Sequence, residues 1–439
     1  MINNFNILVR NQNKIINKTK NYIKKNYKLD INFSIREKNY FSSWANSSGK
    51  IRLKLYLDSR YLSFIFYYVL SLIRKIINNN FYYKILNFSN YKLNYKYIIF
   101  STLSKNDIKN NEIYDRYFSC NIAKTKKVLW LVLYLDDDPV LFKKKPENLI
   151  IIQKKKINKI KYLSFLFWYI FFKKNNIFIT INYQLNKIFS TLKFNHFFFP
   201  FESQPLNYFI LKALRKNNSK IKTYGYIHAA LPPLPTDFIY NYSKPDYVLV
   251  HGIGQKRILE SLNWPVPNIK VINSFRYKKK NKNNFNNKIF LPYDFNNSQI
   301  IINNIKILFN ISNSSKNIKN NKVFEIINHP YMFKSKKHIL LRNEITNIIK
   351  NNFTEYKNVC ICIGATATII ESLENGVEVV QISSDPIFEV HNPKLWKFID
   401  VLPLASNIFH YKLKSTSKYI LFKNKKNFED RIRSLSVVK

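Results

Sequence analysis

The sequence has little glycine, and that scarcity is informative. Of its 439 residues only 6 are glycine, and five of these fall at positions 225, 252, 254, 364 and 376. A chain so poor in glycine keeps it mostly where the backbone needs it. Histidine is skewed in the same way, because six of the 7 histidines stand at or after His228. We therefore expect the C-terminal half to carry the chemistry.

Cysteine and long apolar runs are also scarce. Three cysteines cannot build a disulfide framework, and Cys360 and Cys362 alternate on an expected buried strand, as core residues in a reducing compartment do. The N-terminus lacks the apolar core of a signal peptide. The longest apolar runs, 61–73 and 162–172, are too short to span a bilayer. They read as buried core helices, or as helices that lie in a membrane interface.

Basic charge is what the chain has in excess. It has 72 Lys and Arg against 26 Asp and Glu, which gives a net charge of +46. Nucleic acid, an anionic membrane surface and phosphorylated substrates all fit such a charge. The lysines are scattered, however, and the excess of Lys, Asn, Ile, Tyr and Phe is also typical of an AT-rich coding bias. Two explanations of the basic charge stay open. One is composition drift with weak attraction to membranes, and the other is a dedicated site for a polyanion.

The stretch from Asn358 to Ile382 predicts a buried strand, a tight turn, a helix and a second buried strand. Gly364 opens the turn, where a side chain would crowd a close ligand, and Gly376 ends the helix. Thr366 and Thr368 stand at the helix N-terminus, where free N–H groups and the helix dipole suit a phosphate. The alternative is an ordinary βαβ unit with small residues for packing.

The rest of the chain alternates between strands and helices. Strands are expected at 97–102, 128–135, 149–152, 177–181, 197–201, 222–227, 246–250, 269–272 and 323–327. Helices are expected at 61–78, 206–216 and 298–309, and in the residues before 262. The first strand leads into a loop with Tyr114 to Phe118. Asp136 to Asp138 reads as a solvated turn, because no second carboxylate cluster is nearby in the sequence to complete a metal site.

This alternation continues on both sides of a Lys- and Asn-rich linker at 278–287. It predicts an α/β fold with two doubly wound, Rossmann-like domains that face each other across a cleft, the default substrate site. We place the N-terminal domain at 1–277 and the C-terminal domain at 288–395. Residues 396–439 are expected to pack back across the domains.

Two polar residues follow neighbouring strands of the first domain. Glu202 and His228 come directly after the strands at 197–201 and 222–227. Ligands of open parallel α/β sheets bind outside the carboxyl ends of the strands, so these residues are candidates for chemistry. Glu202 has the alternative role of capping the helix at 206, and His228 that of a satisfied core histidine.

Four segments, in this order, resemble bacterial surface-polysaccharide glycosyltransferases of the GT-B fold, including capsule and lipopolysaccharide types and the related CDP-glycerol glycerophosphotransferases. They are FESQPLNYFILKALRK with GYIHAALPPLP, HGIGQKRILESLNWPVPNIKVINSFRY, INHP, and IGATATIIESLENGVEVV. The first segment is especially similar to surface carbohydrate biosynthesis proteins. The resemblance spans 199–382, under half of the chain, and leaves the first 190 residues unmatched.

The resemblance implies a GT-B glycosyltransferase that needs no cofactor or metal. Its nucleotide-activated donor, with a CMP or CDP type favoured, would bind the C-terminal domain, and a glycan or lipid-linked acceptor the N-terminal side. The donor-binding residues that it implies or adds are His329, Pro330, Gly364, Thr366, Thr368, Glu371 and Arg276. Inverting transfer needs a base to deprotonate the acceptor hydroxyl. Glu202 is the candidate base, with His228 as second choice or orienting partner.

Two other classes of protein fit part of the sequence. A non-hydrolysing nucleotide-sugar epimerase has the same two-domain design, but it needs further acidic residues that the sequence does not locate. A nucleic-acid-binding protein fits the charge, yet no recognised motif or compact basic helix is present, so we expect no dedicated nucleic-acid site. We expect a cytoplasmic enzyme, with peripheral contact to the anionic inner face of the plasma membrane.

Overall fold

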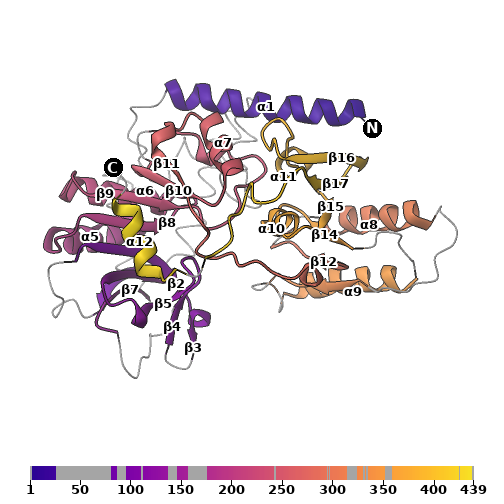
Figure 1. Cartoon of the computed structure of the whole chain (residues 1–439). Helices are drawn as coiled ribbons and strands as arrows, with labels where there is room; N and C mark the ends of the chain where they lie inside the picture. The colour runs from indigo at the N-terminus through magenta and orange to yellow at the C-terminus, as the bar shows by residue number, and fades with distance from the viewer. Residues whose placement is uncertain are drawn as a thin grey trace.

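The computed structural model describes residues 2–25, 81–86, 95–109, 112–136, 146–156, 176–241, 244–293, 295, 297–313, 324–329, 332, 335–351, 358–424 and 426–437. The expected helix at 61–78, the apolar run at 162–172 and Pro330 lie outside them. The described chain forms two α/β halves, each built on a mostly parallel sheet (Figure 1). This architecture confirms the predicted α/β class with two mostly parallel sheets. The cleft and the domain boundaries stay predictions.

The larger sheet has eight described strands in the order β1-β7-β6-β2-β8-β9-β10-β11. Neighbours pair in parallel, except that β1 runs antiparallel to β7. The strands are β1 (Phe81–Leu86), β2 (Tyr97–Leu103), β6 (Val128–Tyr134), β7 (Leu149–Lys156), β8 (His196–Pro200), β9 (Lys222–Tyr226), β10 (Tyr247–Val250) and β11 (Ile269–Val271). A separate small sheet joins β3 (Ile108–Lys109), β4 (Glu112–Asp115) and β5 (Cys120–Asn121).

Helices cover both faces of the larger sheet. β6 reads VLWLVLY and is buried at every position, as a central parallel strand must be. Leu131 packs with the helices of one face, and Trp130 with the other face, where α12 lies in yellow among the magenta strands of Figure 1. The helices of this half are α5 (Asn176–Thr191), α6 (Pro205–Asn217), α7 (Ile253–Ser261) and α12 (Phe428–Val437).

The predicted strand at 177–181 is wrong, because these residues begin helix α5. Ile181, Leu185, Ile188 and Leu192 recur at helical spacing and are all buried in the core of the larger sheet. The short β-branched run by itself is typical of a strand. The apolar repeat of three and four residues, which continues well beyond the run, is typical of a helix.

The second sheet has six described strands in the order β13-β12-β14-β15-β17-β16, in parallel as far as β15. β17 and β16 add an antiparallel hairpin at 399–413, within the segment 396–439, for which no strands were predicted. The strands are β12 (Lys288–Phe290), β13 (Glu325–Ile327), β14 (Val359–Ile363), β15 (Glu378–Ile382), β16 (Ile399–Ala405) and β17 (Ile408–Leu413).

The two faces of the second sheet pack against different partners. Ile361 and Ile363 of β14 contact α8 (Ser298–Asn313) and α9 (Lys336–Asn351) in a separate core. Cys360 and Cys362 point to the other face and join a core that is continuous with the larger sheet. Helix α10 (Thr368–Glu374) lies on that shared face, and α9 was not expected from the sequence.

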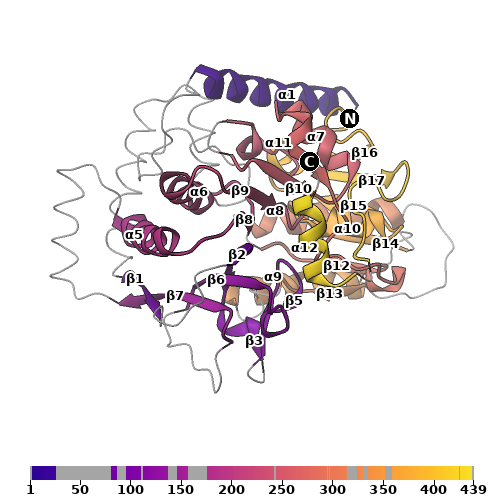
Figure 2. The ribbon, with the colours of Figure 1, turned by 60° about the vertical axis from the view of Figure 1, so that its left-hand side comes forward.

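Two segments tie the halves together. Helix α1 (Ile2–Lys25) runs across both halves at the top of Figure 1, and the Gln12 amide donates to the carbonyl of Ile387 in α11 (Pro386–Glu389) at 2.9 Å. After the hairpin, residues 417–424 return to the larger sheet, where the Ser274 N–H donates to the Leu421 carbonyl at 2.6 Å. Figure 2 shows α12, which follows this segment, lying close to the strands of the larger sheet.

Candidate functional site

Glu202 and His228 lie at the carboxyl edge of the larger sheet. From β2 the chain moves outward to β6 and β7, and it then returns to β8 on the other side of β2. The edge between β2 and β8 is therefore a topological switch point, the place where open α/β sheets bind their ligands. Glu202 comes two residues after β8, and His228 comes two residues after the neighbouring β9.

The two side chains contact each other. His228 Nε2 lies 3.1 Å from Glu202 Oε1, and the side chains are 6% and 35% exposed, respectively. The Gln204 amide donates to the second carboxylate oxygen of Glu202 at 2.6 Å. The Glu202 side chain is thus partly exposed, while the imidazole that contacts it is buried.

The surroundings of Glu202 and His228 lower the pKa of both side chains. Burial raises the pKa of Glu202, but the hydrogen bond from His228, with the charges of Arg116 and Arg276 nearby, outweighs it and leaves this pKa below its ordinary value. Burial also lowers the pKa of His228, against the opposing effect of Glu202. Glu202 is therefore ionised and His228 neutral, with its Nε2 proton donated to the carboxylate. A partly exposed, ionised carboxylate can accept a proton from a substrate hydroxyl.

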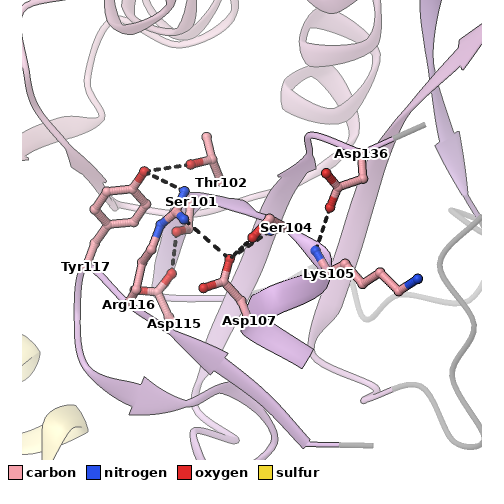
Figure 3. Close-up of polar contacts among 9 residues, drawn as sticks. All are labelled: Ser101, Thr102, Ser104, Lys105, Asp107, Asp115, Arg116, Tyr117 and Asp136. Carbon is pink, nitrogen blue, oxygen red and sulfur yellow. Dashed lines mark hydrogen bonds and ion pairs between the residues drawn. The ribbon is translucent and has the colours of Figure 1, made fainter. Parts of the chain in front are cut away.

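Tyr117 and Arg116, which sequence reasoning left unassigned, complete this edge (Figure 3). The Tyr117 hydroxyl contacts Thr102 Oγ1 at 2.9 Å, and its ring meets His228 edge-on at 4.5 Å between centroids. Arg116 Nη2 donates to the Tyr117 hydroxyl at 3.2 Å, and Arg116 Nη1 lies 3.7 Å from Asp107 Oδ2. The only signal in the sequence was an aromatic and basic loop that follows a strand end.

The remaining groups near this edge are structural. Asp136 accepts the Lys105 N–H at 2.5 Å, and the rest of the predicted turn lies outside the described residues. The buried Asp115 accepts the Phe118 N–H at 2.6 Å and a hydrogen bond from Ser101, and burial raises its pKa to about 6. In the parts of the chain that the structure describes, no group of three or more His, Cys, Asp or Glu side chains is placed to hold a metal ion.

The predicted phosphate turn lies at the switch point of the second sheet, between β12 and β14. Gly364 has φ +71°, a conformation that favours glycine, while a Cβ there would meet Pro292 Cβ only at 3.5 Å. The glycine is thus required by the backbone, rather than by crowding within the protein. The Gln381 amide donates to the Gly364 carbonyl at 2.8 Å and fixes the turn. Gly376, with φ +81°, ends α10 as predicted.

Thr366 and Thr368 share the start of α10. Thr366 Oγ1 lies 3.2 Å from Thr368 Oγ1 and accepts the Thr368 N–H at 3.3 Å. Within the described residues, the N–H groups of 365–367 donate to no partner. Glu371, one helical turn further, is already paired with Lys280 at 2.8 Å. To bind a ribose, Glu371 would therefore have to release Lys280 or to bind the ribose and Lys280 at the same time.

His329 stands at the same edge of the sheet as Gly364, because it follows β13, which is parallel to β14 across β12. Two strand spacings place the ends of β13 and β14 about 10 Å apart. The His329 ring packs edge-on against Tyr293 at 5.1 Å, and burial and His338 lower its pKa. The convergence of His329 with Thr366 and Thr368 on one phosphate stays a prediction.

Arg276 lies near Glu202 and His228 rather than near the turn at Gly364. It follows β11 and is exposed, and its charge acts on the pKa of both Glu202 and His228. The next residue, Tyr277, senses charges from both sides. Burial raises the pKa of Tyr277, the charge of Arg276 lowers it, and the charge of Glu371 raises it. The short segment from Arg276 to Lys280 therefore connects the Glu202 edge with the start of α10, and a donor-binding role of Arg276 stays a prediction.

Comparisons with known proteins find a weak likeness in fold. No protein-family model and no curated protein matches the sequence. Among solved structures, an α,α-trehalose 6-phosphate synthase from Burkholderia multivorans matches with a TM-score of 0.34 and 7% identity, over 64% of this chain and 81% of that one. A UDP-forming α,α-trehalose-phosphate synthase from Burkholderia vietnamiensis matches with a TM-score of 0.33 and 6% identity, over the same shares.

Proposed function

We propose that the chain is a glycosyltransferase that moves a sugar or polyol phosphate from a nucleotide-activated donor to a surface glycan or lipid-linked acceptor. The observation that carries the proposal is the 3.1 Å contact between His228 and the partly exposed Glu202 at the switch point of the larger sheet. The second switch point, at Gly364, offers backbone N–H groups that have no partner within the described residues and are suited to a donor phosphate. One half thus suits the acceptor and the other the donor.

The proposed reaction is a single displacement. In the transfer of a sugar, Glu202 takes the proton of the acceptor hydroxyl as its oxygen attacks the donor carbon, and the bond from that carbon to the phosphate oxygen breaks. The leaving nucleotide gains negative charge, which Arg276 and the N–H groups at 365–367 would stabilise. Displacement from the opposite face inverts the configuration at the donor carbon. The resemblance favours a CMP or CDP donor and requires no metal.

A thermal-shift panel of CMP, CDP, UDP, GDP and ADP tests the donor half. A nucleotide at 100 times its Kd stabilises the native state by about 2.7 kcal/mol and raises the melting temperature. We expect Thr366→Val to reduce the shift, because the hydroxyl that contacts Thr368 is lost. Thr346→Val is the matched control, since this partly exposed threonine bonds only within α9. Absence of any nucleotide shift, together with absence of transfer, would make the proposal wrong.

Peripheral membrane contact is part of the proposal, because a lipid-linked acceptor lies at a bilayer surface. Within the described residues, no helix is long and apolar enough to cross a membrane. The net charge of +46 favours attraction to anionic lipid. Binding to nucleic acid that ignores nucleotide sugars and collapses with salt would favour the nucleic-acid alternative instead.

A further inference from the structure

Ser203, the residue directly after Glu202, has a backbone conformation that L-residues rarely adopt. Its φ is +56°, and the residue is fully buried. Only glycine adopts this region without steric cost, so the surrounding structure must hold a serine there. Because Ser203 joins Glu202 to Gln204, its conformation sets the direction in which the Glu202 side chain leaves the backbone.

A buried lysine from a distant part of the chain holds Ser203. Lys244, which is 2% exposed, donates from Nζ to Ser203 Oγ, to the Tyr208 hydroxyl at 2.5 Å and to the Asp237 carbonyl at 2.6 Å. Ser203 Oγ also contacts the Tyr208 hydroxyl at 2.6 Å and donates to the Asp237 carbonyl. The Ser203 hydroxyl is therefore fixed from three directions. Burial lowers the pKa of Lys244 to about 7, with Asp237 opposing.

A second set of bonds fixes the turn on either side of Ser203. The Asn207 side chain accepts the N–H groups of Glu202 and Gln204, both at 3.2 Å, and donates to the Pro200 carbonyl at 3.0 Å. These bonds close the turn, but they do not reach Ser203 itself. The left-handed residue is held by Lys244, Tyr208 and the Asp237 carbonyl alone among the described groups.

We propose that Lys244 is a positioning residue: its bond to Ser203 holds the left-handed turn that aims Glu202 at His228. The inference rests on the proposed function, in which Glu202 is the base. Lys244 is buried behind the turn and touches neither carboxylate oxygen of Glu202, so it acts through the backbone. Disrupting this bond should let Ser203 relax, and Glu202 should then turn away from His228.

The titration of His228, followed by NMR of labelled histidine, tests the inference without a substrate. Glu202 raises the pKa of His228, so Glu202→Gln defines the downward shift that accompanies loss of the carboxylate. We expect Lys244→Met to shift the pKa of His228 downward as well. The sign is diagnostic, because removing a positive charge by itself would raise this pKa. Lys256→Met, in a surface ion pair of α7, is the matched control and should cause no shift.

Ser203 variants separate positioning from folding. Ser203→Gly adopts the turn without strain, so Lys244→Met combined with Ser203→Gly should return the His228 pKa to its wild-type value. Ser203→Ala keeps the strain and Lys244 but loses the bond, and it should shift the pKa downward even if Lys244→Met does not fold. An unchanged His228 pKa in Ser203→Ala, or in a folded Lys244→Met, overturns the inference. If the His228 pKa shifts in these variants but Glu202→Gln retains full transfer activity, Lys244 is still a positioning residue and the proposed base role of Glu202 is wrong.

Discussion

The glycines at the start of α7 allow a quantitative test of how the returning tail joins the two halves. A Cβ at Gly252 would lie 2.3 Å from the Lys418 carbonyl oxygen, and one at Gly254 would lie 2.4 Å from the Tyr419 ring. Gly252 has φ −165°, an extended conformation open to any residue. The effect of Gly252→Ala is therefore purely steric, and it acts on backbone that cannot rotate away.

The expected loss of stability follows from these contacts. Inserting a methyl group into a packed site costs about 1–3 kcal/mol. Pushing the tail away also removes the Gly254 N–H bond to the Lys418 carbonyl and the Leu421 N–H bond to the His251 carbonyl, both 2.7 Å, each worth about 0.5–1.5 kcal/mol. We expect Gly252→Ala to lower the free energy of unfolding by about 2–6 kcal/mol.

Urea unfolding followed by tryptophan fluorescence measures this loss, and Gly364→Ala is the matched control. At Gly364 there is room for a methyl group but φ is +71°, so the loss should be about 1–2 kcal/mol and smaller for Gly364→Asn. The displaced tail should also disturb Arg276, because Ser274 bonds Leu421 two residues away from it. A Gly252→Ala protein within about 0.5 kcal/mol of wild type would refute the packing described for the tail.

Four further predictions concern activity and location. Glu202→Gln should slow transfer about 10²–10⁴-fold with nucleotide affinity unchanged, and full activity would remove the base assignment. His329→Ala should weaken nucleotide binding as well as turnover, measured with the donor that the thermal-shift panel identifies; unchanged affinity would exclude a phosphate contact. Because the pKa of both Glu202 and His228 is lowered, wild-type kcat/KM should stay constant around neutral pH and fall only below the ordinary imidazole value of 6.5, whereas a fall that begins above it would contradict the neutral state of His228. Flotation with anionic liposomes should occur at low salt and be lost at high salt, and flotation that survives alkaline carbonate would mean an integral anchor.

Local pattern in the sequence determined the strands and turns on which the site depends. Continuous apolar runs gave β6 and β14, since a central parallel strand is buried on both faces. Scarce glycine marked the left-handed positions 364 and 376, which only glycine adopts readily. The meeting of Glu202 with His228 was also predictable, because consecutive parallel strands bring their carboxyl ends to one edge.

Tertiary structure decided what depends on residues far apart in the chain. The apolar run at 177–181 is helical because its apolar repeat continues onto the core of the larger sheet. Tyr117 reaches His228 only because β2 lies in the middle of the sheet, beside β8. Lys244 meets Ser203 across 41 residues, and no local pattern encodes such a bond. Periodicity fixes the faces of single elements, whereas these contacts depend on how the crossovers order the strands.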